Sequence, residues 1–374
     1  MKTIWLLLAA TLSAHAQQSW QFAVAGDSRN CGDVVMPAIA KSVQATRAQF
    51  YWHLGDFRKI YDFDEDMLAA IDVKNATLPP EKQTHLNIID YENKSWPDFI
   101  ANQANRFELP VYLGIGNHET TPPKSKPEWV AQFADWLTLP NIVKQRLLDN
   151  SNDRLVKPYY HWIQNGVDFL NLDNGGQDYA FDRDQMLWIT DRVDYIKSRP
   201  EITTVIVGAH AALPHSLSCD HSMNQTPQGE RSGVTVYKQL LDLAKAGKKV
   251  YLFGSHSHYK LENIYDTDYW RNNGGVLPGW IVGTAGAIRY RLPDTAADMP
   301  KSRAQTDVYG YYLVTVAADG SVSVDFREVK RSDVPGDVDT TFGKAFVDKC
   351  FAGNADFHPQ HSAKCVENKP CAMP

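Results

Sequence analysis

Short apolar runs alternate with longer amphipathic segments along most of this chain. The runs are rich in aromatic and β-branched residues and end at glycine, which is typical of strands buried within a sheet. One intervening segment, residues 182–196, has apolar residues at the spacing of an amphipathic helix. The alternation predicts a layered α/β fold, with strands over residues 22–25, 50–54, 111–114, 203–207, 250–253 and 280–282.

Three further segments have patterns of their own. Two alternating runs between residues 311 and 329 flank Asp319-Gly320, which predicts a β-hairpin. Residues 61–108 contain Pro79-Pro80 and begin with the acidic stretch YDFDEDM, and we interpret them as an insertion whose acidic side chains are solvated. From about residue 331 onward the pattern fades, so we expect one main domain over 17–335 and a polar tail over 336–374.

Residues 1–16 have the three parts of a secretory signal peptide. Lys2 supplies the positive start, residues 4–10 are apolar, and Ala14-His15-Ala16 forms an A-x-A cleavage site. The apolar part is too short to span a bilayer. We therefore expect cleavage before Gln17, a secreted or periplasmic protein, and no membrane association after cleavage.

The charge of the chain argues against one class of partner. The 374 residues have a formal net charge of −6 and no cluster of lysine or arginine. Proteins that bind nucleic acid depend on such basic surfaces, so nucleic acid is not expected as a main partner.

The most informative residues are the polar ones that follow the predicted strands. Five of these strands end in glycine, followed within two residues by an aspartate, asparagine or histidine. Ligand sites in α/β sheets lie beyond the carboxyl ends of strands, where glycine allows the chain to turn sharply. The candidate residues are Asp27, Asp56, Asn117, His118, Glu119, His210, His256 and His258.

Each candidate also has an ordinary structural explanation. A single aspartate can form a turn, an asparagine can cap a helix, and a histidine can be buried with its hydrogen bonds satisfied. The repetition of the same position after five strands favours one shared site. Carboxylate, amide and imidazole ligands together suit Mn²⁺, Fe or Zn²⁺ better than a Ca²⁺ cage or a thiolate site. The sequence therefore predicts a metal centre.

The order of these motifs resembles the calcineurin-like metallophosphoesterase family. The family pattern is Asp-x-His, Gly-Asp, Gly-Asn-His-Glu/Asp, a strand-end His, and Gly-His-x-His, and GNHE at residues 116–119 is the most specific match. The resemblance covers about residues 20–330 and is of the secreted bacterial type, with a distant similarity to purple acid phosphatases. It implies a two-sheet β-sandwich flanked by helices, in an αββα arrangement.

The resemblance also implies a role for each candidate. Two divalent ions, of Mn, Fe or Zn, would activate a hydroxide for attack on a phosphoryl group, and His118 would protonate the leaving oxygen. Asp56 would bridge both ions. The remaining ligands would be Asp27 and His258 for the first ion, and Asn117, His210 and His256 for the second.

The chain departs from the family pattern at two positions, Arg29 and Ser255, and from the purple acid phosphatase branch at Lys59. Arg29 stands where the first motif has histidine, and arginine stays protonated and cannot ligate a metal. We expect Arg29 to face the pocket and grip phosphate oxygens instead. Lys59 stands where purple acid phosphatases have a tyrosine, so their iron–tyrosine site is not expected. Ser255 replaces a glycine just before His256.

Together these residues imply an exported, metal-dependent phosphoesterase. It would hydrolyse a small phosphomonoester or phosphodiester by attack of metal-bound hydroxide. One alternative is a non-catalytic binding protein on the same fold, with one metal site degraded at Arg29. Another is a structural protein whose motifs are vestigial, which would bind no metal.

Five cysteines fit an oxidising compartment, and none of them forms a CxxC pair. We expect one disulfide that involves the tail cysteines Cys350, Cys365 and Cys371. Cys31 and Cys219 both follow candidate ligands, so a bridge between them across the pocket rim is an alternative that the sequence leaves open.

Overall fold

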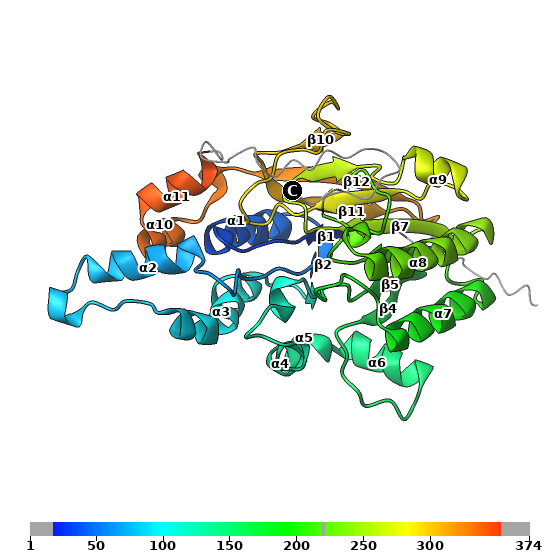
Figure 1. The fold of residues 1–374 in the computed structure, drawn as a ribbon, viewed down its shortest axis with the longest axis horizontal. Helices are drawn as coiled ribbons and strands as arrows, with labels where there is room; N and C mark the ends of the chain where they lie inside the picture. The colour runs from blue at the N-terminus through cyan, green and yellow to red at the C-terminus, as the bar shows by residue number, and fades with distance from the viewer. Residues whose placement is uncertain (1–17, 219–220, 353–374) are drawn as a thin grey trace, which may run out of the picture.

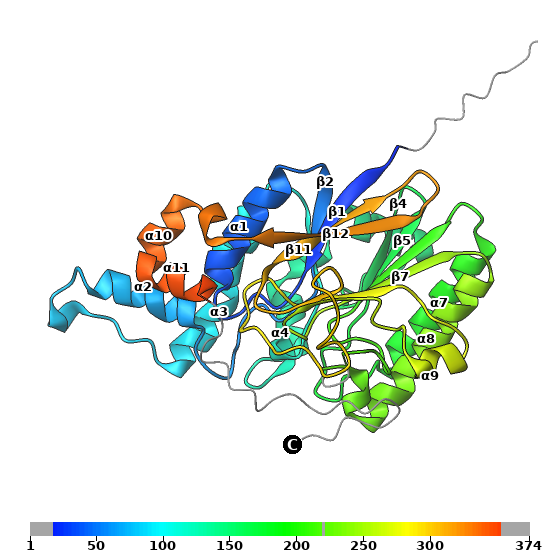
Figure 2. The same cartoon turned by 90° about the horizontal axis from the view of Figure 1, so that it is seen from above.

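The chain folds into two β-sheets that lie between layers of helices (Figures 1 and 2). The computed structural model describes residues 18–218 and 221–352. The first sheet contains, in spatial order, β12 (Val322–Val329), β11 (Tyr309–Val316), β1 (Trp20–Ala25), β2 (Ala48–His53) and β3 (Val111–Leu113). The second sheet contains β10 (Ala304–Gln305), β8 (Lys260–Glu262), β9 (Gly279–Val282), β7 (Lys249–Gly254), β6 (Thr204–Gly208), β5 (Val167–Asn171) and β4 (Tyr160–Gln164).

The strands that carry the candidate residues are parallel within each sheet. Strands β1, β2 and β3 run parallel, and so do β5, β6, β7 and β9. All six strands predicted from apolar runs are present, and β11 and β12 form the predicted antiparallel hairpin. The short strands β8 and β10 were not predicted. The two-sheet arrangement flanked by helices confirms the expected fold class.

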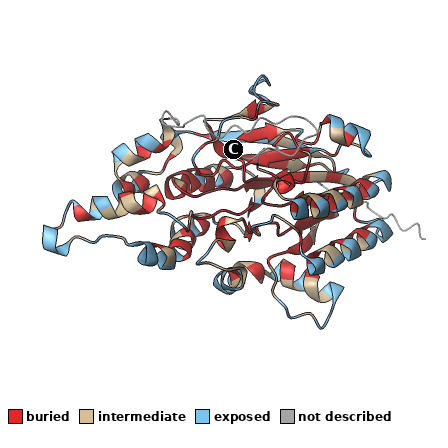
Figure 3. Cartoon of the chain, in the orientation of Figure 1, coloured by how far each residue is buried: buried red, intermediate tan, exposed pale blue. Residues whose placement is uncertain are grey.

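Helices cover the outer face of each sheet, with their apolar sides turned inward (Figure 3). Helix α8, for example, buries Val236, Leu240 and Leu243, which recur at helical spacing. The predicted helix over 182–196 is present as α7, with Asp182 as its N-cap. The helices are α1 (Gly32–Gln44), α2 (Glu65–Asn75), α3 (Ile88–Asn102), α4 (Lys126–Gln132), α5 (Ala134–Leu137), α6 (Pro140–Asp149), α7 (Arg183–Ser198), α8 (Pro227–Lys245), α9 (Asp268–Asn272), α10 (Gly336–Phe342) and α11 (Lys344–Phe351).

Aromatic side chains fill the space between the sheets. Phe22 and Phe50 of the first sheet stack with ring centroids 5.0 Å apart, and Trp162 and Phe169 of the second stack at 4.8 Å. Phe50 meets Phe169 edge to face at 5.3 Å, which joins the two sheets. Each buried ring stabilises the fold by about 1.5–3 kcal/mol through removal from water. This packing fixes the distance between the strand ends of the two sheets.

Two of the four acidic residues at the start of residues 61–108 are buried, which corrects the interpretation of a solvated face, although Asp62 is exposed. Asp64 and Asp66 are fully buried. Arg58, also buried, pairs with Asp66 at 2.9 Å and contacts Asp33 of α1. Asp64 accepts a hydrogen bond from the backbone N–H of Asn30 at 2.5 Å. Because buried carboxylates need charged or hydrogen-bonding partners, these contacts fasten the segment to the loop that follows β1.

A disulfide joins Cys31, at the start of α1, to Cys350 in α11, 319 residues away. The alternative bridge from Cys31 to Cys219 is therefore wrong, because Cys31 is already paired. Helices α10 and α11 bury Val338 and Val347, so residues 336–351 pack against the rest of the fold. The other cysteines, Cys219, Cys365 and Cys371, lie outside the described residues.

Residues 1–16, interpreted as a signal peptide, lie outside the described residues. Among the helices that the structure describes, none has both the length and the apolar character required to cross a bilayer.

A buried ion-pair cluster joins β4, β5 and α6 at a distance from the candidate site. Nδ1 of His161 lies 2.8 Å from Asp168, and its Nε2 lies 2.5 Å from Asp149. Burial alone would lower the pKa of His161, but the charge of Asp168 and the contacts with both carboxylates outweigh it and raise the pKa to about 9. The imidazolium form therefore stabilises the folded chain.

This cluster predicts a specific loss of stability at alkaline pH. The contribution of His161 is fully present below its unfolded pKa near 6.5 and is lost as the pH rises through about 9. The free energy of unfolding of the parent should therefore fall by about 3 kcal/mol more than that of His161→Gln between about pH 6 and about pH 9.5. Denaturant titrations measure this, with exposed His85→Gln as the control. If the free energy of unfolding fell equally with pH in the parent and in His161→Gln, the raised pKa assigned to His161 would be contradicted.

Candidate active site

The candidate residues converge where the carboxyl ends of strands from both sheets meet. Asp27 follows β1, Asp56 follows β2, and Asn117 follows β3 of the first sheet. His210 and His256 follow β6 and β7 of the second sheet. Asp27, Asp56 and His256 have positive φ angles of 61°, 60° and 66°, which are uncommon outside glycine. Strained backbone at three strand ends indicates that the surrounding structure fixes these side chains for a purpose.

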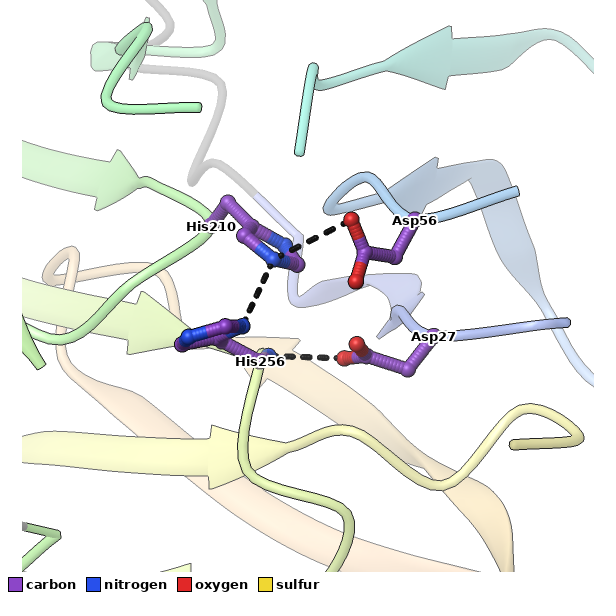
Figure 4. Close-up of side chains that lie close together, drawn as sticks. All are labelled: Asp27, Asp56, His210 and His256. Atoms are coloured by element: carbon purple, nitrogen blue, oxygen red, sulfur yellow. Dashed lines mark hydrogen bonds and ion pairs between the residues drawn. The ribbon is translucent and has the colours of Figure 1, made fainter. Parts of the chain in front are cut away.

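Four side chains form a compact cluster at this junction. Asp27, Asp56, His210 and His256 point toward one another, and each offers a ligand atom within 4.8 Å of the others (Figure 4). Nε2 of His210 lies 3.3 Å from the Asp56 carboxylate and 3.1 Å from Nδ1 of His256. The side-chain oxygen of Asn117 lies 3.0 Å from the same Nε2. The atoms therefore converge on one small volume.

Several ligand atoms in this cluster lack a hydrogen-bond partner within the described part of the chain. They are Oδ1 of Asp27, Oδ2 of Asp56 and Nε2 of His256, all of which are buried. An unpaired buried polar atom costs about 1–3 kcal/mol, and a charged one costs more. A divalent cation at this place would offset that cost. The mixture of carboxylate, amide oxygen and imidazole is also a ligand set that such ions accept.

The orientation of His210 is fixed from behind the cluster. Its Nδ1 lies 3.0 Å from the carbonyl oxygen of Leu54 and 3.1 Å from Oγ of Ser255. Because a carbonyl only accepts, Nδ1 donates the hydrogen bond and Nε2 faces the cluster. Ser255 fits beside Gly26, where a Cβ would lie only 2.6 Å from Oγ. The serine that departs from the family pattern thus supports a candidate ligand.

The charge of the neighbouring carboxylate also acts on His210. Burial lowers the pKa of His210, but the charge and hydrogen bond of Asp56 outweigh burial and raise the pKa to about 9. A proton and a divalent ion compete for the same Nε2 lone pair. Metal binding at this position would therefore release a proton.

Glu119 lies beneath the cluster and holds the loops that carry its ligands. Its carboxylate accepts hydrogen bonds from the backbone N–H groups of Asp56, Phe57 and Gly116, at 2.8, 2.8 and 2.7 Å. Burial and the charge of Asp56 raise the pKa of Glu119 to about 8, against the effect of these donors. Glu119 therefore positions Asp56 and the GNHE loop.

Arg29 lies in the same pocket, on the side of Asp27 and His258. Nη2 of Arg29 lies 2.9 Å from Nε2 of His258 and 3.3 Å from the hydroxyl of Tyr290. The same Nε2 of His258 lies 3.3 Å from the Asp27 carboxylate. Nε of Arg29 lies 4.0 Å from the Asp56 carboxylate. The arginine is thus surrounded by residues that the family pattern gives to the first metal.

His118 contacts both Arg29 and the loop that follows β2. Its Nδ1 lies 2.6 Å from the carbonyl oxygen of Lys59, and its Nε2 contacts Nη1 of Arg29. Its backbone N–H donates to the Asp56 carboxylate at 3.0 Å. Burial and the charge of Arg29 lower the pKa of His118 to about 4.

Three tyrosines that were not among the predicted site residues lie against the candidate histidines. Tyr61 stacks on His118 with ring centroids 5.1 Å apart, and Tyr290 stacks on His258 at 3.8 Å. The ring centroids of Tyr179 and His256 lie 5.2 Å apart. None of the three tyrosines follows a strand-end glycine, so the pattern that found the ligands could not find them.

Comparison with known proteins agrees with this geometry. The family model described as calcineurin-like phosphoesterase matches residues 22–260. The chain belongs to the calcineurin-like phosphoesterase family. The family is one of metal-dependent phosphoesterases, and the buried aspartate–histidine cluster of this chain could hold metal. No curated protein matches the sequence.

Two solved structures share the fold of this phosphoesterase. The purple acid phosphatase PPD1 from yellow lupin (Lupinus luteus) seeds matches with a TM-score of 0.51 and 13% identity, over 84% of this chain and 52% of the lupin chain. PhoD matches with a TM-score of 0.50 and 12% identity, over 89% of this chain and 77% of its own. This chain therefore spans about half the length of the lupin enzyme. At these identities the likeness supports the fold alone.

The close approach of backbone and ligands at Gly116 gives a testable prediction. A Cβ on Gly116 would lie 2.2 Å from Oδ1 of Asp56 and 2.9 Å from Cε1 of His210. Gly116→Ala should therefore displace both ligands and weaken Mn²⁺ binding at least about tenfold, since such overpacking costs about 1–3 kcal/mol. Calorimetric titration of the demetallated protein measures this.

A second glycine provides the matched control. Gly336, at the start of α10, has no atom from another part of the described chain within 4 Å of a Cβ built on it, so Gly336→Ala should bind Mn²⁺ like the parent. Unchanged affinity in folded Gly116→Ala would show that Asp56 and His210 are not ligands of the ion.

Proposed function

We propose that this phosphoesterase is exported from the cytoplasm and hydrolyses a small phosphomonoester or phosphodiester. The proposal rests on one observation, the cluster of buried ligand atoms without partners at the ends of strands from both sheets. The signal-like residues 1–16 and the Cys31–Cys350 disulfide support export, because disulfides persist in oxidising compartments.

The proposed metal site has two halves that share Asp56. When bound, divalent ions supply water that ionises near neutral pH and positive charge opposite the phosphoryl oxygens. Asp56 has one carboxylate oxygen near His210 and the other near Arg29, which suits a residue between the halves. Whether a metal ion also binds in the half that contains Asp27 and His258 depends on Arg29, which lies in that half. The proposed ligands are Asp27, Asp56, Asn117, His210, His256 and His258.

Arg29 and His118 are proposed to act on the substrate directly. The Nε–H of Arg29 is buried without a hydrogen-bond partner among the described residues, so it is available to a phosphoryl oxygen. In neutral His118 the Nδ1 proton is donated to the carbonyl of Lys59, so only Nε2 can serve a leaving oxygen. We assign His118 the protonation of that oxygen, a role in which Nε2 must first part from Nη1 of Arg29 and take up a proton.

Dependence on metal is the first test of this function. A chelator should lower hydrolysis of an aryl phosphate at least about 100-fold, because the activated water and the charge on the phosphoryl group are both lost. Asp56→Asn should lower the bound metal at least as much as any other single ligand change, since it removes the carboxylate that lies between the two halves. Elemental analysis and turnover are measured on the same samples.

The control for this test is Asp135→Asn, an exposed carboxylate in α5. It should leave metal content and turnover unchanged. Full activity in rigorously demetallated protein would refute the metal-dependent mechanism, and bound metal without turnover of any phosphate ester would favour the binding-protein alternative.

The acid role of His118 predicts a dependence on the leaving group. An acid is needed most when the leaving oxygen is basic, so His118→Ala should lower kcat/KM by about 100-fold for an alkyl phosphate. For a nitrophenyl phosphate the loss should be at most about tenfold, because that oxygen leaves without a proton. His85→Ala, at an exposed position, is the control. An equal loss on both esters would mean that His118 positions other groups.

A further inference from the structure

The guanidinium of Arg29 occupies the half of the site that the family pattern gives to the first metal ion. Nη2 of Arg29 lies 2.9 Å from Nε2 of His258, and Nη1 contacts Nε2 of His118. Nε lies 4.0 Å from the Asp56 carboxylate, and the Asp27 carboxylate lies 3.3 Å from the same Nε2 of His258. The residues around the first position thus already surround a cation.

Hydrogen bonds occupy both ring nitrogens of His258, so the imidazole has no lone pair left for a metal. Its Nδ1 contacts the carbonyl oxygen of Ile288, and because a carbonyl only accepts, Nδ1 carries the proton. The only lone pair of a neutral imidazole is then on Nε2, where Arg29 donates its N–H. An ion at this position would have to displace the guanidinium.

On the other side of Arg29, His118 also has one ring nitrogen on a carbonyl oxygen and the other on the guanidinium. Its Nδ1 is 2.6 Å from the carbonyl oxygen of Lys59, so its Nε2 accepts from Nη1 of Arg29. Tyr290, stacked on His258, adds a third contact through its hydroxyl at 3.3 Å from Nη2. The guanidinium is therefore held on several sides, and the Arg29 side chain is only 7% exposed.

The other half of the site is free of Arg29. No hydrogen bond or ion pair joins Arg29 to Asn117, His210 or His256 in the described structure. His210 uses Nδ1 behind the cluster, which leaves Nε2 facing Asn117 and His256. With the Oδ1 oxygen of Asp56, this half provides a full set of converging ligand atoms.

We propose that this phosphoesterase binds one divalent ion, at Asp56, Asn117, His210 and His256, and that the Arg29 guanidinium permanently replaces the other. The inference rests on the proposed function for its metal dependence. The replacement lowers the charge at the first position from that of a divalent ion to that of a single guanidinium. A guanidinium can donate to phosphoryl oxygens but cannot act as a Lewis acid toward water. Arg29 therefore orients the phosphoryl group, and the nucleophile comes from the remaining half.

The test is a count of ions per folded chain. Demetallated parent protein is loaded with excess Mn²⁺, freed of unbound ion, and analysed for the Mn-to-protein ratio. The parent should hold one ion and show the spin-resonance spectrum of an isolated Mn²⁺. Arg29→His, which supplies an imidazole in place of the guanidinium, should hold two ions and show a magnetically coupled pair. Arg29→Lys should still hold one.

Three further variants locate the ion and control for the substitution. His256→Ala should lose the single ion of the parent, whereas His258→Ala should keep it. Arg183→His makes the same chemical change at an exposed position at the start of α7 and should hold one ion. Circular dichroism establishes that each variant is folded. If Arg29→His does not fold, Arg29→Ala frees the same lone pair of His258 and should admit a second, weaker ion.

Each result is decisive. Two ions in the parent, or loss of its ion in His258→Ala but not in His256→Ala, would overturn this inference and leave the phosphoesterase function intact. A single ion in both the parent and the folded Arg29 variants would show that Arg29 does not exclude the second ion. No ion in the parent would overturn the metal-dependent function itself, and this inference with it.

Discussion

Two buried carboxylates impose the main constraint on this structure. Asp27 and Asp56 are completely buried where the sheets meet, and each has one oxygen without a hydrogen bond to any described residue. Carboxylates persist in such a place only beside positive charge or several donors. Among the described residues, Arg29 provides a fixed cation whose charge acts on both. In our proposal, a divalent ion in the half around His210 compensates the remaining negative charge.

The scaffold holds these groups together against their repulsion. Aromatic packing between the sheets, such as Phe50 on Phe169, sets the separation of the strand ends. Glu119 ties the loops after β2 and β3 through three backbone hydrogen bonds, and Ser255 orients His210 from behind. The positive φ angles of Asp27 and Asp56 show that backbone strain is tolerated to aim the side chains inward. Stability in the core thus maintains geometry in the site.

The fold and the convergence of the candidate residues could be predicted because their signals are local. Apolar runs that end in glycine identify strand ends, and parallel strands bring those ends to one edge, as at Asp56 and His256. Partners distant in sequence could not be predicted in the same way. From the sequence alone Asp66 is expected to be solvated, but the fold buries it beside Arg58. The Cys31–Cys350 disulfide joins residues from opposite ends of the described chain. Tyr290 likewise reaches the site only through tertiary packing.

The position of bound metal is the most direct measure of this account. Crystals of the parent soaked in Mn²⁺ and measured at the manganese absorption edge would show each ion as an anomalous peak. The account predicts a single strong peak among Asp56, Asn117, His210 and His256, with the Arg29 guanidinium beside His258. A peak of equal strength between Asp27 and His258, with Arg29 turned away, would contradict it.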